Sequence, residues 1–266
     1  MDILNQIVQH KKQEVTQRKA LYPIALLERS IYFQSETVSL SKYILRKDKS
    51  GIIAEIKRKS PSKGIINQHV NVERTSIGYM QAGASALSIL TDETFFGGKN
   101  DDLTTARKFN FCPILRKDFI IDEYQIIEAK SIGADAILLI ASILNPTEIN
   151  NLAQFAHQLG LEVLLEVHNL AELQSSLNNY IQLIGVNTRN LKTFEVDNQL
   201  GYSLVQEIPS NYVKIAESGI QHPDDLIKLK SVGFQGFLIG ESFMRNSCPE
   251  LACESFIKQV NALANE

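Results

Sequence analysis

A carboxylate and an amine close the first apolar run of this sequence. The run "GIIAEIK" covers residues 51–57 and ends with Glu55 and Lys57, two positions apart. Residues i and i+2 of a strand project from the same face, so these two side chains should lie together. An exposed ion pair on a half-buried strand is one interpretation, and a pair that works in proton transfer is the other. The positions of the remaining charged residues decide between them.

Polar residues fall at the ends of four later apolar runs. These residues are Lys117, Glu166, Asn187, Glu217 and Ser218. Mixed acids and bases without a cofactor signature favour proton-transfer chemistry, because crowded carboxylates and lysines shift each other's pKa. The five histidines show no metal-binding spacing. We therefore expect no metal and no cofactor.

Eight short apolar runs alternate with helix-like stretches and would supply the strands that carry these residues. The runs cover residues 51–57, 84–90, 112–117, 135–141, 161–167, 181–187, 212–218 and 234–240. Helices are predicted at 71–83, 122–133, 146–160 and 222–233, several of them ending in glycine. Continuous apolar runs are typical of parallel strands buried on both faces. The pattern predicts an α/β fold, a (β/α)8 TIM barrel, in which all strand ends meet at one catalytic face.

A doubly wound open sheet is the competing fold. It would normally carry a glycine-rich dinucleotide fingerprint after its first strand, and "EIKRKSPSKG" does not fit that pattern. No linker or low-complexity tract divides the chain. We predict a single barrel domain over residues 1–266, with residues 1–47 as an N-terminal helical extension. Leu4, Ile7, Val8 and Val15 would form the apolar face of its first helix.

Two loops near the C-terminus have the character of a phosphate site. "AESGI" places Ser218 and Gly219 after the seventh strand, and "IGES" places Gly240 and Ser242 after the eighth. Barrels commonly bind phosphate with the backbone N–H groups of these two loops. The alternative is that the glycines only permit tight turns. Lys57 and Arg189 are then available to bind a second anionic group of the ligand. Arginine is well suited to bind a carboxylate.

Composition limits the possible partners of the chain. A formal charge of −3 over 266 residues argues against nucleic-acid binding, and no run is long and apolar enough to span a membrane. The N-terminus is too polar for a secretory signal. The cysteines, Cys112, Cys248 and Cys253, are odd in number and form no C-x-x-C pair, which favours free thiols in the cytoplasm. We expect a cytoplasmic protein that is a monomer.

The motifs together resemble the indole-3-glycerol phosphate synthase family. The resemblance rests on "AEIKRKSPSKG", "SILTDETFFGG", "CPILRKDFIIDEYQI", "LLEVH", "GVNTRNLKTFEVD", "AESGI" and "LIGESFM", in family order and over essentially the whole chain. Two departures are Thr188, where Asn is common, and Phe243, where Leu is common; neither is a catalytic type. The resemblance implies a monofunctional enzyme that converts 1-(2-carboxyphenylamino)-1-deoxyribulose 5-phosphate to indole-3-glycerol phosphate, carbon dioxide and water.

The resemblance also implies roles for single residues. Lys117 would be the general acid that protonates the ketone oxygen as the ring closes. Glu166 would stabilise charge and handle a proton, and Glu55 would orient Lys57, which helps to bind the anionic end of the substrate.

The resemblance extends to the rest of the site. Asn187 and Glu217 would complete the catalytic ring, and Ser60 and Arg189 would hold the carboxylate. How Glu55, Lys57 and Glu166 divide the later proton transfers stays open.

Three other functions are compatible with a phosphate-binding barrel. A Schiff-base aldolase would use Lys117 or Lys57 as an amine nucleophile. Phosphoribosylanthranilate isomerase resembles this fold but lacks the "KRKSPSKG" run and the long N-terminal segment. A catalytically silent barrel would have lost a catalytic group, and none is missing here.

Overall fold

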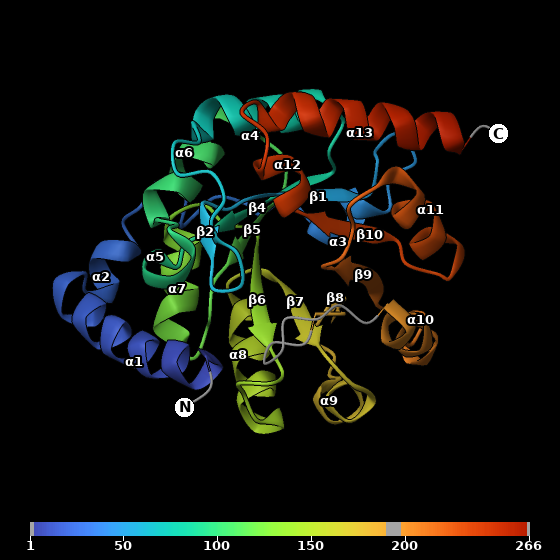
Figure 1. Ribbon diagram of the computed structural model, residues 1–266. Coiled ribbons are helices and arrows are strands. Elements are labelled where there is room, and N and C mark those ends of the chain that lie inside the picture. The colour runs from blue at the N-terminus through green and yellow to red at the C-terminus, as the bar shows by residue number, and fades with distance from the viewer. Residues whose placement is uncertain (1–2, 190–197, 265–266) are drawn as a thin grey trace.

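Eight parallel strands form a closed barrel in the computed structural model, which describes residues 3–189 and 198–264 (Figure 1). The strands are β1 (Ile52–Ile56), β4 (Ala86–Leu90), β5 (Ile114–Lys117), β6 (Ala136–Ile140), β7 (Glu162–Val167), β8 (Leu183–Asn187), β9 (Val213–Glu217) and β10 (Gly236–Ile239). Neighbours along the chain pair with one another, and β10 closes the barrel onto β1. Each strand lies inside one of the eight predicted runs. The predicted TIM barrel is confirmed.

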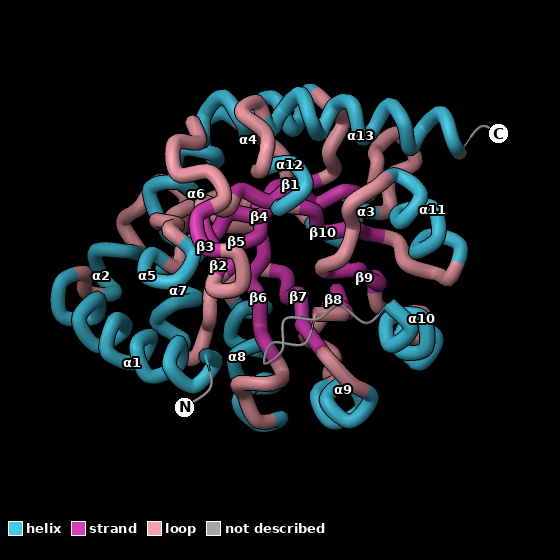
Figure 2. Tube along the Cα trace, viewed as in Figure 1, coloured by secondary structure: helices cyan, strands magenta, loops and turns pink. Residues whose placement is uncertain are grey.

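Helices surround the barrel and connect successive strands (Figure 2). The long ones are α4 (Val72–Gln81), α6 (Asn100–Phe109), α7 (Glu123–Ser131), α8 (Pro146–Gln158), α9 (Leu170–Ser176), α10 (Asn198–Glu207), α11 (Pro223–Ser231) and α13 (Pro249–Leu263). The short helices α5 (Glu93–Phe96) and α12 (Glu241–Met244) follow β4 and β10. Local sequence sets these ends: Asn145 and Glu148 form a capping box at the start of α8, with Pro146 in its first turn.

Three helices precede the first strand. They are α1 (Ile3–Leu21), α2 (Ile24–Leu27) and α3 (Leu40–Ile44). In Figure 1, α1 and α2 lie at one side of the barrel, next to α7. The predicted helical extension covers these elements, although residues 1 and 2 lie outside the described chain, as do residues 265 and 266 of the predicted domain. The division at residue 47 stays a prediction.

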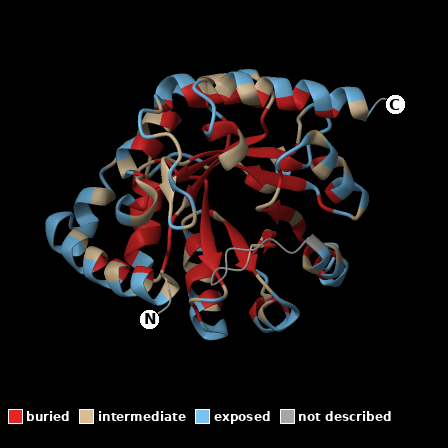
Figure 3. Ribbon diagram, in the orientation of Figure 1, coloured by how far each residue is buried: buried red, intermediate tan, exposed pale blue. Residues whose placement is uncertain are grey.

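Apolar side chains fill the barrel and the layer between strands and helices. Figure 3 shows that the barrel strands are mostly buried. The interior is packed by residues such as Ile53, Leu115, Leu164 and Ile215, all 0% exposed. A filled interior leaves the strand ends as the place where polar groups can face a ligand. Within residues 3–189 and 198–264, no helix has the length and apolar character needed to cross a membrane.

A small hairpin follows β1. Its strands β2 (Lys59–Ser60) and β3 (Gly64–Ile65) pair antiparallel and carry the "KSPSKG" sequence. Arg58 holds the base of this hairpin in place, because its side chain donates hydrogen bonds to the carboxylate of Asp102 in α6 and to the carbonyl of Gly97. The hairpin therefore holds Ser60 at the edge of the face where the strands end.

Candidate active site

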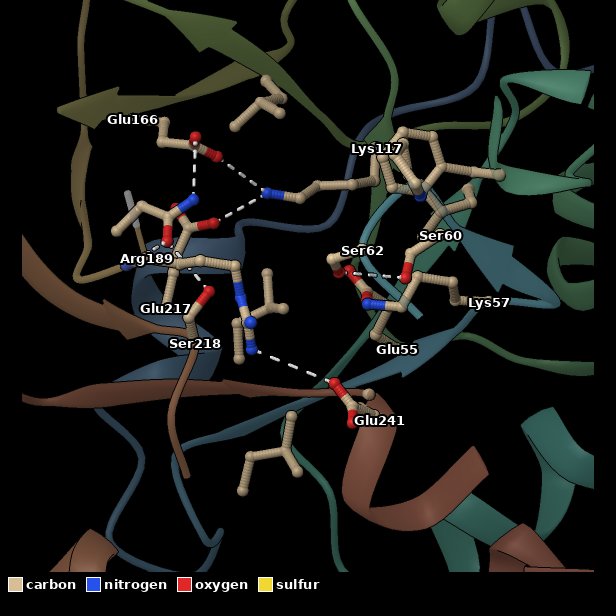
Figure 4. A pocket seen from close by; sticks show the side chains of 18 of the residues that line it. Glu55, Lys57, Ser60, Ser62, Lys117, Glu166, Arg189, Glu217, Ser218 and Glu241 are labelled. Atoms are coloured by element: carbon tan, nitrogen blue, oxygen red, sulfur yellow. Dashed lines mark hydrogen bonds and ion pairs between the residues drawn. The ribbon is translucent and has the colours of Figure 1, made fainter. Parts of the chain in front are cut away.

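One pocket opens at the carboxyl ends of the strands (Figure 4). Its lining includes every residue predicted for the site: Glu55, Lys57, Ser60, Lys117, Glu166, Asn187, Arg189, Glu217, Ser218, Gly219, Gly240 and Ser242. They come from the ends of β1, β5, β7, β8, β9 and β10 and from the loops that follow. The structure brings together residues that are up to 187 positions apart in the chain. Residues 190–197 of the "GVNTRNLKTFEVD" motif lie outside the described chain.

Lys117 occupies the centre of a carboxylate pair. Its Nζ atom lies 2.6 Å from Glu217 Oε2 and 3.1 Å from Glu166 Oε2, as the dashed lines in Figure 4 show. Burial by itself would lower the pKa of Lys117, but Glu217, Glu166 and Glu55 attract the ammonium and raise the pKa above its usual value. Lys117 is therefore an ammonium ion, able to donate a proton but not to act as a free amine.

The two carboxylates beside Lys117 differ electrostatically. Burial raises the pKa of Glu217 to about 7, which the nearby Glu166 reinforces and Lys117 opposes. Burial acts on Glu166 as well, but Lys117, His168 and Asn187 outweigh it and hold its pKa well below the usual range. Two neighbouring carboxyl groups with separated pKa values are a recurrent arrangement for acid and base roles.

Glu55 and Lys57 form a pair inside the pocket. Lys57 Nζ donates to Glu55 Oε1 at 2.7 Å, and Glu55 is only 2% exposed. The interpretation of an exposed surface pair is therefore wrong. Space for Glu55 depends on Gly240, because a Cβ atom at that position would lie 2.5 Å from Glu55 Oε1.

A second glycine makes room for a second carboxylate. A Cβ atom on Gly185 of β8 would collide with Oε1 of Glu217, which stands on the neighbouring strand β9. Both glycines are thus needed for close approach between strands rather than for a special backbone conformation.

The loops after β9 and β10 are joined to each other and to β8. Ser242 Oγ donates to the Ile220 carbonyl at 2.7 Å, and Ser218 Oγ donates to Asn187 Oδ1 at 2.8 Å. Ser218 and Gly219 both have positive φ, 67° and 77°. A positive φ is costly for serine and is found mainly where the surrounding structure requires it. The result is a fixed backbone turn at the predicted phosphate loops.

An arginine and an acid face each other across the pocket mouth. Arg189 Nη2 lies 3.9 Å from Glu241 Oε2 (Figure 4), and Arg245 lies 3.1 Å from the other oxygen of Glu241. The backbone N–H of Arg189 donates to Asn187 Oδ1 at 3.0 Å. Arg189 thus lines the pocket with its guanidinium group turned towards Glu241.

Apolar residues form another part of the pocket lining, called here the apolar wall. It is made by Phe96, Phe119, Leu138 and Ile140, together with Ile3, Leu4 and Ile7 of α1. The rings of Phe96 and Phe119 are 5.8 Å apart. The sequence interpretation missed this wall, because only tertiary contacts bring α1 to the pocket. Such a wall suits a flat aromatic group.

A buried lysine fastens α1 to the barrel. Lys11 is 0% exposed, and its Nζ atom lies 2.9 Å from Asp118 Oδ1 and 3.1 Å from Asp92 Oδ2. Asp118 directly follows Lys117 and is also bound by Arg116 at 3.1 Å. Lys11 and Arg116 hold the pKa of Asp118 well below its usual range, although burial acts in the opposite direction. The sequence did carry a signal, since Ile7, Lys11 and Val15 are spaced as one helical stripe.

Residues suited to a metal are not grouped in the part of the chain that the structure describes: no three of its His, Cys, Asp and Glu side chains form a cluster that could hold an ion. The pocket itself offers an ammonium ion, two unlike carboxyl groups and a Glu–Lys pair, all facing one cavity.

Solved structures confirm the architecture. The tryptophan synthase alpha subunit from Legionella pneumophila superposes with a TM-score of 0.62 over 86% of this chain and 100% of its own, at 13% identity. Thiamine phosphate pyrophosphorylase from Pyrococcus furiosus gives a TM-score of 0.61 over 85% and 99% of the two chains, at 14% identity. At this identity the likeness shows the barrel fold alone.

Sequence comparisons are more specific. The family model of indole-3-glycerol phosphate synthase matches residues 4–256. The indole-3-glycerol phosphate synthase of Bacteroides thetaiotaomicron is 47% identical over 97% of this chain and 99% of its own. That of Caldanaerobacter subterraneus subsp. tengcongensis is 42% identical over 97% and 98%. The chain therefore belongs to the indole-3-glycerol phosphate synthase family, carboxy-lyases of tryptophan biosynthesis that act on a phosphorylated small molecule.

Proposed function

We propose that this pocket closes the ring of 1-(2-carboxyphenylamino)-1-deoxyribulose 5-phosphate with Lys117 as the general acid. The observation that carries the proposal is the position of Lys117 Nζ, 2.6 Å from Glu217 and 3.1 Å from Glu166, at the centre of the pocket. An ammonium ion held by two carboxylates can give a proton to a ketone oxygen and be recharged afterwards.

The walls of the pocket match the three ends of this substrate. The aromatic ring packs on Phe96, Phe119 and the first turns of α1. The phosphate binds the backbone turns at Gly219 and Gly240 and the hydroxyl groups beside them, Ser218 and Ser242. Arg189, Ser60 and Lys57 hold the carboxylate, which arginine can bind through two parallel hydrogen bonds.

Ring closure forms the new carbon–carbon bond. The aromatic carbon that bears the carboxylate attacks the ketone carbon, and Lys117 donates its proton to the ketone oxygen as the double bond to oxygen breaks. The ring becomes cationic, and the carboxylate of Glu166 stabilises the positive charge. Asn187 keeps Glu166 in place by donating to Oε1 at 3.1 Å.

The later steps restore the aromatic ring. Carbon dioxide leaves, and its bonding electrons return to the ring. Lys57 gives a proton to the new hydroxyl group, which departs as water, while Glu166 removes a proton from the carbon next to nitrogen to complete the indole. Glu55, 2.7 Å from Lys57, orients that ammonium. Because an anionic carboxylate leaves as neutral carbon dioxide, one proton is taken up from solvent per turnover.

Enzymatic synthesis is tested by fluorescence, since the chain has no tryptophan. Addition of the substrate to purified protein in the presence of a chelator should produce rising indole emission, and mass spectrometry should find indole-3-glycerol phosphate. Lys117→Ala should abolish the signal, whereas Lys108→Ala, at an exposed lysine of α6, should retain it. No emission from folded wild-type protein would refute the proposal.

The same electrostatics argue against an aldolase that uses Lys117 as its nucleophile. A Schiff-base lysine must be a neutral amine, and such lysines have lowered pKa values. The pKa of Lys117 is raised instead, because Glu217, Glu166 and Glu55 outweigh the effect of burial. Borohydride treatment with substrate should therefore leave no adduct on this residue, and a stable adduct of substrate mass would favour the aldolase.

We further propose a monomeric, cytoplasmic enzyme. Cys112, Cys248 and Cys253 are free thiols, as suits a reducing compartment. Light scattering on the eluted protein should give a mass near 29.8 kDa; twice that mass would contradict the monomer.

A further inference from the structure

One histidine lies behind the catalytic carboxylate and has no part in the reaction as described so far. His168 follows Glu166 by two residues at the end of β7, so both side chains project from the same side of the strand. Its Nε2 atom lies 3.3 Å from Glu166 Oε1, and its Nδ1 atom lies 3.3 Å from Glu172 Oε2. The imidazole is thus placed between two carboxylates, one facing the pocket and one on α9.

Glu172 is held firmly enough to act as a fixed anion. The backbone N–H of His168 donates to Glu172 Oε2 at 2.8 Å, and Asn169 Nδ2 donates to Oε1 at 2.8 Å. The side chain of His168 is 13% exposed, which limits screening by water. Glu166 and Glu172 hold its pKa at about 10, although burial alone would lower it. His168 therefore carries a positive charge at neutral pH.

Glu166 and Glu217 have different neighbours, and His168 is part of that difference. Lys117 faces both carboxylates from β5. Glu166 also accepts a hydrogen bond from Asn187 of β8, and the positively charged His168 lies beside it. Glu217 on β9 has one buried oxygen, Oε1, without a hydrogen-bond partner among the described residues. Two like charges around one ammonium ion repel each other, so an added positive charge beside one of them decides which carboxylate keeps the proton.

We propose that His168 is a positioning residue that keeps Glu166 ionised, and so assigns it the role of base while Glu217 holds the proton. The inference rests on the proposed roles of Lys117 and Glu166 in ring closure and dehydration. It differs from a purely structural role in one respect: the charge of His168 is required, and not only its shape or its hydrogen bond.

Two substitutions separate charge from shape. His168→Asn removes the charge and shortens the side chain, whereas His168→Gln also removes the charge but keeps an N–H donor near the position of Nε2. His157→Asn is the matched control, because His157 is exposed on α8. A melting temperature for each variant shows which of them remain folded.

The pH dependence of kcat gives the first measurement. Activity needs ionised Glu166, so it falls as the pH drops through the pKa of that group. Loss of the His168 charge raises this pKa, and the acid limb should move to higher pH by roughly one to two units in both His168 variants. The His157 variant should keep the wild-type limb. If His168→Gln restores the wild-type limb, or if both variants lose activity equally at every pH, the charge is not the reason and the proposal fails.

A second measurement does not depend on catalysis. Carbon-13 labelling of glutamate side chains allows the carboxyl groups to be titrated by NMR, with Glu166 and Glu217 assigned through Glu166→Gln and Glu217→Gln. In wild-type protein Glu166 should titrate below Glu217, and the separation should shrink in His168→Asn. If that variant does not fold, Glu172→Gln should reduce the separation by weakening the hold on the imidazolium. An unchanged separation contradicts the inference about His168 even if the synthase assay succeeds.

Discussion

The Nζ atom of Lys117 lies 2.6 Å from Oε2 of Glu217, whose side chain is only 2% exposed, and the lysine side chain is 13% exposed. The two residues stand on strands that are not neighbours in the barrel, β5 and β9, and their side chains meet over its axis. The contact makes each group depend on the other: the carboxylate stabilises the ammonium, and the ammonium opposes the protonation of the carboxyl group that burial favours. Changes at either residue should therefore be visible in both activity and stability.

Glu217→Gln should change how stability depends on pH. The pKa of Glu217 is raised by burial to about 7, above its ordinary value of 4.5. The folded state therefore favours the protonated form of Glu217. The stability that this preference contributes is fully present below the pKa of the group in the unfolded chain, and it is lost as the pH rises from about 4.5 through 7. Between pH 5 and pH 8 the free energy of unfolding of wild type should fall relative to that of the variant, by roughly 1–3 kcal/mol. Urea denaturation at both pH values measures this difference, with Glu207→Gln, at an exposed residue of α10, as the control. Parallel pH curves for wild type and Glu217→Gln would contradict the raised pKa.

Gly185→Ala should damage the site without touching any charged residue. The new methyl group would collide with Oε1 of Glu217 and push this carboxylate away from Lys117. We expect kcat to fall at least about tenfold, as follows for a displaced catalytic group. The double variant Gly185→Ala with Glu217→Ala should be less destabilised than the sum of the single variants, because the clash is gone. Strict additivity would show that the two residues do not press on each other.

Lys11→Met should loosen α1 and remove the lysine partner of two buried acids. Loss of one partner from a buried ion pair typically costs about 3–5 kcal/mol, and here Asp92 and Asp118 both lose their lysine. Because α1 contributes to the apolar wall, KM should also rise. Lys12→Met is a matched control on the exposed side of the same helix. Urea denaturation of both variants measures their free energies of unfolding, and substrate titration measures KM. Equal stability of the two variants would mean that the buried contact of Lys11 contributes nothing to the stability of the protein.

Ser242→Ala should weaken phosphate binding with little effect on chemistry. The hydroxyl group lines the pocket and ties the loop after β10 to the carbonyl of Ile220. Loss of a hydrogen bond of ordinary strength corresponds to a rise in KM of roughly 3- to 10-fold, with kcat nearly unchanged. Inorganic phosphate should inhibit this variant less strongly than wild type. A matched change at exposed Ser231 should have no effect on either constant. A drop in kcat at constant KM would place Ser242 in the chemistry instead.

The barrel and the charged half of the pocket were predictable from sequence for physical reasons. Strands buried on both faces read as continuous apolar runs, and a polar residue at the end of such a run has only the pocket to face. Glu55, Lys117 and Glu166 could be found in this way. Their roles could not, since the pKa of a carboxyl group depends on neighbours from other strands.

The parts that sequence did not reveal depend on long-range contacts. The hairpin at residues 59–65 is too short to give a strand pattern, and the apolar wall needs α1 to fold back over the barrel. Lys11 was not expected to be buried, because a lysine is assigned to the surface unless its acidic partners are known. Those partners, Asp92 and Asp118, lie 81 and 107 positions further along the chain.

The general-acid role of Lys117 is the central claim, and transient kinetics on Lys117→Ala tests it most directly. The variant should be mixed with saturating substrate, and bound substrate and indole emission should be followed separately. We expect substrate to bind with an affinity close to that of wild type, because phosphate, carboxylate and ring contact other residues. The first-order rate of indole formation should fall about 10²- to 10⁴-fold, as for loss of a positioned acid. Indole formation at the wild-type rate, with Lys108→Ala behaving identically, would show that another group protonates the ketone.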